Sequence, residues 1–158
     1  MADANRIFEV LAKWNRWAGV AADTGFPRDL TRRILLAVGG PEVIALQGIR
    51  RCGKSTILFQ VMDALLARGT DARDILYINF DEPLFAARGA ANVLPQLYEI
   101  YRERLNPDRH AYVFLDEVQL VPEWEKWVRS IVDLKEAKVI VTGSSSRLLS
   151  QEYSGNGS

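Results

Sequence analysis

Hydrophobic residues follow two patterns that alternate along the chain. Short, nearly continuous apolar runs fit buried strands, and longer segments with apolar residues every three or four positions fit helices. The predicted strands cover residues 41–47, 74–80, 111–115 and 138–142. The predicted helices cover residues 28–38, 55–68, 92–105 and 122–134, and a further helix begins at residue 145. This alternation predicts an α/β fold in which helices cover both faces of a parallel sheet.

The N-terminal segment carries an apolar stripe of its own, which predicts one amphipathic helix. The residues at helical spacing are Ile7, Val10, Leu11, Trp14 and Trp17. Residues 18–27 read as a turn-rich connector. We therefore expect residues 1–40 to be a helical segment that packs on a core formed by residues 41–153, and residues 154–158 to be a flexible tail.

Composition and charge narrow the class of protein. Lys and Arg together number 20, as do Asp and Glu, so the formal net charge is zero. That balance does not indicate a nucleic-acid partner or a membrane surface. The chain has one Cys and no apolar run of membrane-spanning length, and residues 1–10 lack the apolar stretch of a signal peptide. We expect a cytoplasmic protein.

The segment Gly48–Ser55 (G-I-R-R-C-G-K-S) fits the phosphate-binding loop pattern G-x-x-x-x-G-K-[ST]. It follows a predicted strand and opens a predicted helix, which is the order that the loop requires. Glycines let successive backbone N–H groups face one phosphate, Lys54 can reach the outer phosphates, and the Ser55 hydroxyl can ligate Mg²⁺. The predicted ATP-binding residues are Gly48, Ile49, Arg50, Arg51, Cys52, Gly53, Lys54, Ser55 and Thr56.

Three side chains inside this loop have alternative interpretations. Arg50 and Arg51 could face the γ-phosphate, but side chains at such positions often point away, so a solvated or interface role is favoured. Cys52 lies beside Lys54 near a helix N-terminus, a setting that can lower a thiol pKa. We interpret Cys52 as a small loop residue, with redox regulation as the alternative.

A second motif ends the third predicted strand. Phe114, Leu115 and the apolar residues before them lead into Asp116 and Glu117, which is a Walker B pattern. Asp116 is predicted to hold Mg²⁺ together with Ser55. Glu117 is the predicted general base that orients and polarises the attacking water. The alternative for Glu117 is an acid that stabilises a helix N-terminus.

Thr142-Gly143-Ser144 ends the fourth predicted strand. If this strand lies between the strands of the first two motifs, a polar side chain here is near the γ-phosphate. Ser144 is the first choice for this sensor position and Thr142 the second. The alternative is that the serines cap the following helix. The predicted catalytic residues are therefore Glu117, Lys54 and Ser144.

The three motifs together resemble the predicted AAA+ superfamily ATPases of bacteria and archaea, over roughly residues 24–151. The matching segments are G-I-R-R-C-G-K-S, L-D-E-V-Q-L-V-P-E-W-E-K-W and V-T-G-S-S-S-R-L-L-S. The resemblance implies a P-loop core with a catalytic glutamate and strand order 5-1-4-3-2. It also implies the family roles for Lys54, Ser55, Asp116, Glu117 and Ser144. Gln119 and Trp124 match family positions, and we interpret Trp124 as a packing residue.

The chain departs from the family pattern at its end, because the family continues into a fifth strand and a C-terminal domain. We therefore expect a truncated core without the fifth strand, an arginine finger or a lid over the adenine. The strand of residues 41–47 would then be an exposed sheet edge.

The expected function is ATP binding and Mg²⁺-dependent hydrolysis, coupled to a conformational switch in a C-terminal domain or a protein partner. One alternative is a nucleotide-dependent interaction module with negligible turnover. A second is a P-loop small-molecule kinase, which the absence of an Arg-rich lid after the fourth strand disfavours. A third is a nucleic-acid-coupled motor, which the neutral charge does not support. The sequence leaves open whether the protein forms a homo-oligomer. It lacks the guanine-specificity motif N-K-x-D, which favours ATP over GTP as the nucleotide.

Overall fold

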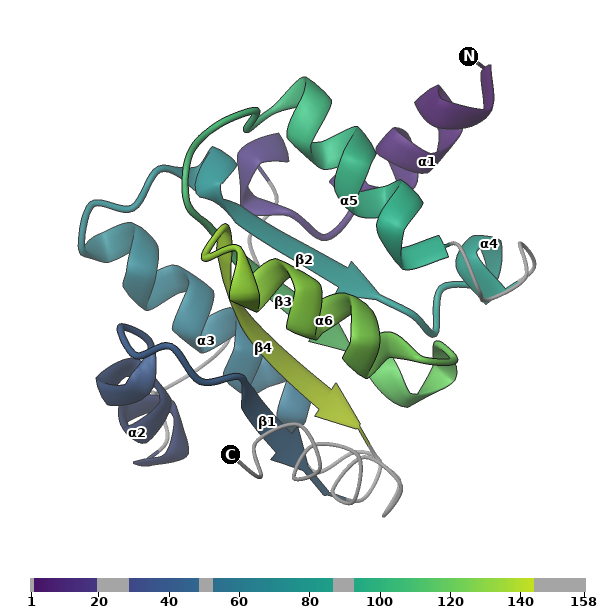
Figure 1. The fold of residues 1–158 in the computed structure, drawn as a ribbon. Coiled ribbons are helices and arrows are strands. Elements are labelled where there is room, and N and C mark those ends of the chain that lie inside the picture. The colour runs from purple at the N-terminus through teal and green to yellow at the C-terminus, as the bar shows by residue number, and fades with distance from the viewer. Residues whose placement is uncertain (1, 20–28, 49–52, 87–92, 144–158) are drawn as a thin grey trace.

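The structure is a computed structural model and describes residues 2–19, 29–48, 53–86 and 93–143. Four strands form one sheet, and every neighbouring pair is parallel. Their bounds are β1 Ile44–Gln47, β2 Ile75–Asn79, β3 Ala111–Asp116 and β4 Ala137–Gly143. The strand order is β1-β4-β3-β2, and the four arrows point the same way in Figure 1. The predicted α/β fold and the predicted order of these four strands are confirmed.

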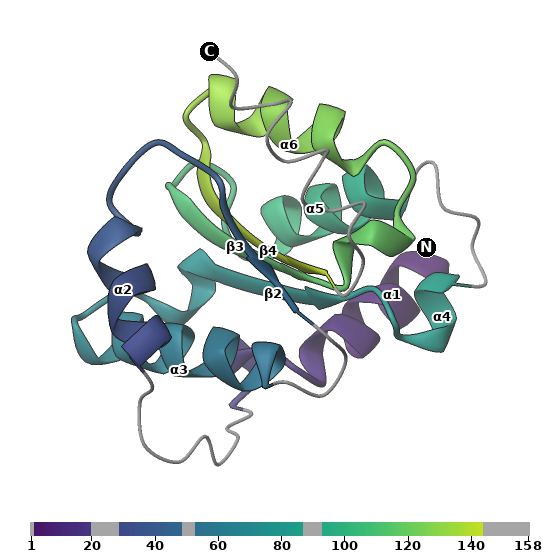
Figure 2. The same ribbon diagram turned by 90° about the horizontal axis from the view of Figure 1, so that it is seen from below.

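Helices lie on both faces of the sheet, as Figure 2 shows in cross-section. The α-helices are α1 Ala2–Ala12, α2 Asp29–Ala37, α3 Lys54–Ala67, α4 Pro83–Ala86, α5 Val93–Arg104 and α6 Trp124–Asp133. Short 3₁₀ helices are η1 Arg16–Ala18, η2 Ala72–Asp74 and η3 Val118–Leu120. Among these helices, none has both the length and the apolar composition needed to cross a membrane.

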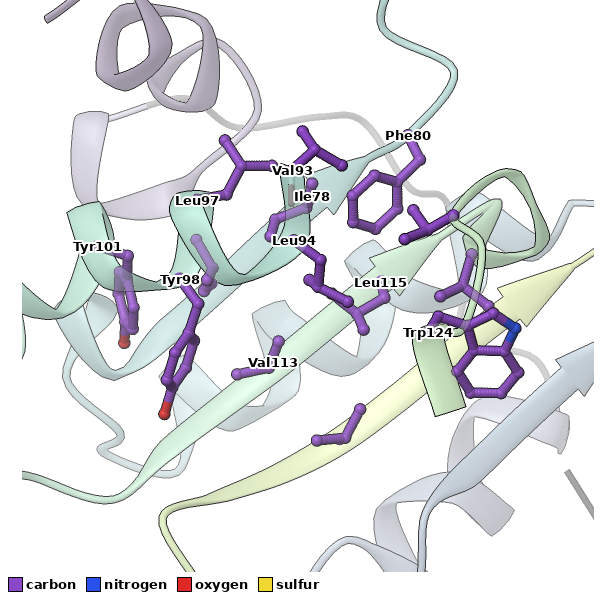
Figure 3. Packing of buried hydrophobic residues seen from close by; sticks show 14 of the residues in the cluster. Ile78, Phe80, Val93, Leu94, Leu97, Tyr98, Tyr101, Val113, Leu115 and Trp124 are labelled. Carbon is purple, nitrogen blue, oxygen red and sulfur yellow. The ribbon is translucent and has the colours of Figure 1, made fainter. Parts of the chain in front are cut away.

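The core has two layers because successive strand residues face opposite sides of the sheet. On one face, α2 and α3 pack against Ile75, Tyr77, Phe114 and Ile140. On the other face, α1, α5 and α6 cover a second group of strand residues, part of which Figure 3 shows together with Trp124. That group consists of Leu76, Ile78, Val113, Leu115, Val139 and Val141. Burial on both faces explains why the strands read as nearly continuous apolar runs.

The N-terminal segment differs from the single helix that its apolar stripe predicts. Helix α1 ends at Ala12, Trp14 lies beyond it with 39% of its surface exposed, and Trp17 belongs to η1. Trp17 stacks on Phe8 with ring centroids 5.1 Å apart. The prediction of a continuous helical stripe is therefore wrong for Trp14 and Trp17.

The side chain of Asn15 explains why the chain leaves the helix there. Its Nδ2 donates to the backbone oxygens of Leu11, at 2.7 Å, and Tyr77, at 2.9 Å. Its Oδ1 accepts the backbone N–H of Tyr77 at 2.7 Å. The fully buried amide of Asn15 thus satisfies both outward-facing backbone groups of Tyr77 at the edge of β2. Buried backbone groups need such partners, so this contact overrides the helical pattern.

We expect Asn15→Ala to lower the free energy of unfolding by about 3 kcal/mol, because it leaves a buried backbone donor and acceptor without partners. Urea denaturation measures the change. Asn5→Ala is the matched control, since Asn5 is exposed and bonds only the Arg104 side chain in the described contacts. A loss for Asn15→Ala no larger than that of the control would contradict the assigned role.

Strand β1 is shorter than predicted: it begins at Ile44, whereas the sequence predicted a start at residue 41. The buried ammonium group of Lys138, on β4, donates to the backbone oxygens of Gly40 and Glu42. These bonds hold residues 40–42 in a turn beside β4 instead of extending the strand. Burial also lowers the pKa of Lys138 from its ordinary value.

Candidate functional site

The motifs singled out in the sequence follow strands whose carboxyl ends lie at one edge of the sheet. Gly48 follows β1, Asp116 ends β3, and Gly143 ends β4. The backbone N–H of Gly48 donates to the Gly143 oxygen at 3.3 Å, so the first and third motifs are adjacent. This edge is where parallel α/β sheets bind ligands. Ile49, Arg50, Arg51, Cys52 and Ser144 lie outside the described residues.

Gly53 connects the predicted phosphate-binding loop to α3. It has φ +87°, a left-handed conformation that glycine adopts without the strain of a side chain, and it is the N-cap of α3. The first helical residue is Lys54, and its buried side chain donates from Nζ to the Gly48 oxygen at 2.8 Å. Lys54 therefore spans the loop from its last glycine to its first. Thr56 is half-buried in the first turn of the helix.

The carboxylate of Asp116 is the centre of the site. It is 2% exposed and accepts hydrogen bonds from three hydroxyl groups. Ser55 Oγ and Tyr77 Oη donate to Oδ2 at 2.6 and 2.5 Å, and Thr142 Oγ1 donates to Oδ1 at 2.5 Å. These donors come from α3, β2 and β4, so residues up to 61 positions apart in sequence converge on one side chain.

Thr142 links Asp116 to the next residue. Besides donating to Asp116, its hydroxyl accepts the backbone N–H of Glu117 at 3.0 Å. Thr142 was the second choice for the sensor position, and it lies against the Walker B residues of the neighbouring strand. The first choice, Ser144, is not among the residues whose placement the structure describes.

Glu117 adopts a left-handed backbone conformation, with φ 58° and ψ 45°. Such a conformation is uncommon for a residue with a side chain and persists only where its surroundings hold it. Here the bond to Thr142 holds its N–H, and its backbone oxygen accepts from the N–H of Leu120 at 3.2 Å. This conformation turns the chain out of β3. The Glu117 side chain is held as well, because Gln119 Nε2 donates to Glu117 Oε2 at 2.6 Å.

Tyr77 is the residue of this site that sequence reasoning missed. Its pattern is that of a core residue, and it is 2% exposed. Burial, together with the negative charge of Asp116, raises the pKa of Tyr77 well above its ordinary value, so the hydroxyl stays protonated and donates. The strand order offered a signal, because Tyr77 lies on the strand next to the Walker B strand.

The donor set suits a small divalent cation. Mg²⁺ prefers oxygen ligands and is usually bound through one or two carboxylates plus substrate phosphates. The Ser55 hydroxyl and the Asp116 carboxylate supply such oxygens 2.6 Å apart, and Ser55 is exposed. Within the described ranges, no group of three or more His, Cys, Asp or Glu side chains forms an alternative metal site.

The curated proteins that are similar to this chain include two that are 33% identical to it. An uncharacterized protein of Haemophilus influenzae is 33% identical over 107 residues, which is 68% of this chain and 26% of the relative. An uncharacterized protein of Methanocaldococcus jannaschii is 33% identical over 111 residues, covering 70% of this chain and 23% of the relative. The chain thus spans about a quarter of the length of these relatives.

Among solved structures, the crystal structure of a DNA replication initiation factor aligns with 80% of this chain and 42% of its own, with a TM-score of 0.47 and 17% sequence identity. A comparison with protein families finds that residues 40–157 match the family described as AAA domain. That range contains all three motifs and supports a nucleotide-binding, ATPase-like function. Since the match extends over most of its length, the chain belongs to the AAA domain family.

Proposed function

We propose that this domain binds ATP and hydrolyses it with the help of Mg²⁺. The observation that carries the proposal is the hydrogen bond of 2.6 Å between Ser55 Oγ and Asp116 Oδ2. It brings the last residue of the predicted phosphate-binding loop to the carboxylate that ends β3, the predicted Walker B strand. Two motifs that were separate in sequence therefore meet at one point of the sheet edge.

The phosphates of ATP would bind where α3 begins. The N-terminal turn of a helix presents unpaired N–H groups and the positive end of the helix dipole, which both favour an anion. Lys54 adds a charge at this end, and its bond to the Gly48 oxygen holds the ammonium group across the loop. We assign phosphate binding to Lys54 and to the backbone N–H groups of residues 49–56.

Ser55 and Asp116 would hold Mg²⁺, which when bound neutralises charge on the phosphates. Asp116 is held in one orientation by hydrogen bonds to both of its oxygens. The Ser55 hydroxyl belongs to the same helix turn as Lys54, so it contributes its oxygen next to the phosphate-binding ammonium group.

Glu117 is the proposed general base. It would orient the attacking water and accept its proton on the carboxylate. Glu117 directly follows Asp116 at the end of β3, and its backbone is left-handed. Thr142 and Gln119 hold its backbone and side chain. This base favours transfer of the phosphoryl group to water rather than to a small-molecule acceptor.

We further propose that the nucleotide cycle is coupled to a conformational change in a protein partner or a further domain. In the two relatives, about three quarters of the polypeptide lies outside the matched region. Coupling of this kind requires that ATP and ADP bind two arrangements with different affinity.

The test of the proposed function is phosphate release from ATP, measured with Mg²⁺ and with EDTA. We expect release only with Mg²⁺, and we expect Ser55→Ala to lower the rate about tenfold or more, because it removes one cation ligand. Ser130→Ala is the control, since its hydroxyl also serves as a hydrogen-bond donor, to the Trp127 oxygen on the exposed side of α6. Equal rates with Mg²⁺ and EDTA would contradict the proposal.

A further inference from the structure

The contacts around Asp116 assign a role to a residue outside the known motifs. We propose that Tyr77 is a positioning residue for the divalent-cation site, which holds Asp116 in the orientation needed for cation binding. This inference rests on the proposed function, because it concerns the same carboxylate. It gives β2, and through β2 the N-terminal segment, a part in nucleotide binding.

The two hydroxyl groups on Asp116 Oδ2 differ in their freedom. Ser55 is exposed at the start of α3, and as a cation ligand it would turn its oxygen toward the cation. Tyr77 is buried and donates to the same oxygen at 2.5 Å. Once Ser55 is engaged elsewhere, Tyr77 is the described donor that stays on Oδ2, opposite the Thr142 bond to Oδ1. One fixed donor on each oxygen keeps the carboxylate from rotating.

The side chain of Tyr77 is held by a ring contact with α3. Its ring packs against Phe59 of α3, with centroids 4.8 Å apart and planes tilted by 46°. Phe59 in turn lies under the guanidinium group of Arg16, which is 5.1 Å from the Phe59 centroid, and Arg16 Nε donates to Asp63 at 2.8 Å. The phenol ring of Tyr77 therefore packs against the same helix that carries Ser55.

The backbone of Tyr77 is held as firmly as its ring. Both of its outward-facing backbone groups are bonded to the buried amide of Asn15. A fixed ring and a fixed backbone fix the position of the phenol oxygen, and from that position the hydroxyl donates to Asp116. Partners of this kind behind a metal ligand are typically worth ten- to a hundredfold in metal affinity.

The experiment titrates Mg²⁺ against the chain at a fixed ATP concentration and follows ATP binding by calorimetry, for wild type, Tyr77→Phe and Tyr101→Phe. Tyr101 is the matched control, because it is also fully buried on the other side of the sheet, and its hydroxyl donates to the Arg73 oxygen and accepts from Asn106 Nδ2. We expect Tyr77→Phe to raise the Mg²⁺ concentration for half-maximal binding about tenfold. ATP affinity in EDTA and the Mg²⁺ requirement of Tyr101→Phe are expected to match wild type.

A second readout separates cation binding from folding. Thermal unfolding in EDTA should show a similar loss for both variants, whereas stabilisation by ATP at subsaturating Mg²⁺ should be smaller in Tyr77→Phe alone. If Tyr77→Phe keeps the wild-type Mg²⁺ requirement, or lowers it, the positioning role is wrong while the proposed function stands. If wild type itself binds ATP without any dependence on Mg²⁺, the proposed function fails and this inference fails with it.

Discussion

Replacing Glu117 with Gln is expected to reduce phosphate release from ATP by about 10²- to 10⁴-fold while leaving ATP affinity close to that of wild type. Gln has the same shape and still offers an oxygen to the Gln119 amide, which donates to Glu117 Oε2 in the structure. It cannot accept a proton from water, so only the chemical step loses its base. Single-turnover hydrolysis and calorimetric binding, measured on the same preparation, separate the two effects.

The control for this variant is Glu123→Gln. Glu123 shares the left-handed backbone of Glu117, with φ 60°, but its side chain is 70% exposed and pairs with Lys126 on the surface. This substitution should leave both binding and hydrolysis unchanged. Wild-type turnover in Glu117→Gln would remove Glu117 from the mechanism and revive its alternative role as an acid near a helix terminus.

Replacing Lys54 with Ala is expected to weaken ATP binding at least about 100-fold, because it removes the charge that faces the phosphates at the start of α3. It also removes the hydrogen bond from Lys54 Nζ to the Gly48 oxygen, which connects the two ends of the loop. Isothermal titration with ATP and Mg²⁺ measures the change. This outcome would place the nucleotide at the predicted loop rather than elsewhere on the surface.

Lys126→Ala is the control for the lysine variant, because Lys126 is 74% exposed and its described ion pair is the surface bond to Glu123. Far-UV circular dichroism of both variants verifies that helix content is kept. Binding by Lys54→Ala with wild-type affinity would show that the loop is not the phosphate site. The Walker A assignment would then have to be abandoned, whatever the hydrolysis assay gives.

Local patterns were enough to predict the strands, and strand order followed from the family resemblance. Strands buried on both faces give apolar runs that are hard to mistake, and loops at the carboxyl ends of β1, β3 and β4 carry the polar motifs. The predicted pairing of Ser55 with Asp116 in one site has a direct contact to support it. The roles of Lys54, Glu117 and Asp116 stay predictions until they are measured.

Contacts between distant residues could not be predicted from periodicity. Asn15 and Tyr77 are 62 positions apart, and their pairing ends the helical stripe before Trp14. Lys138 shortens β1 through bonds to residues 98 and 96 positions away. Tyr77 has the sequence pattern of a core residue, because its ring packs in the core. Its hydroxyl alone reaches Asp116. The hydrophobic pattern of the sequence therefore indicates the packing of the Tyr77 ring but not the hydrogen bond of its hydroxyl.

The Asn15 amide also bears on how copies of this chain can associate. A foreign strand adds to a sheet by pairing with the outward N–H and C=O groups of an edge strand. At the centre of β2 these groups already have partners in Asn15. The Tyr77 oxygen accepts from Asn15 Nδ2, and the Tyr77 N–H donates to Asn15 Oδ1. An incoming strand would gain no new bonds at Tyr77 and would have to expel a fully buried side chain. The Asn15 amide therefore disfavours the addition of a further strand at the centre of the β2 edge.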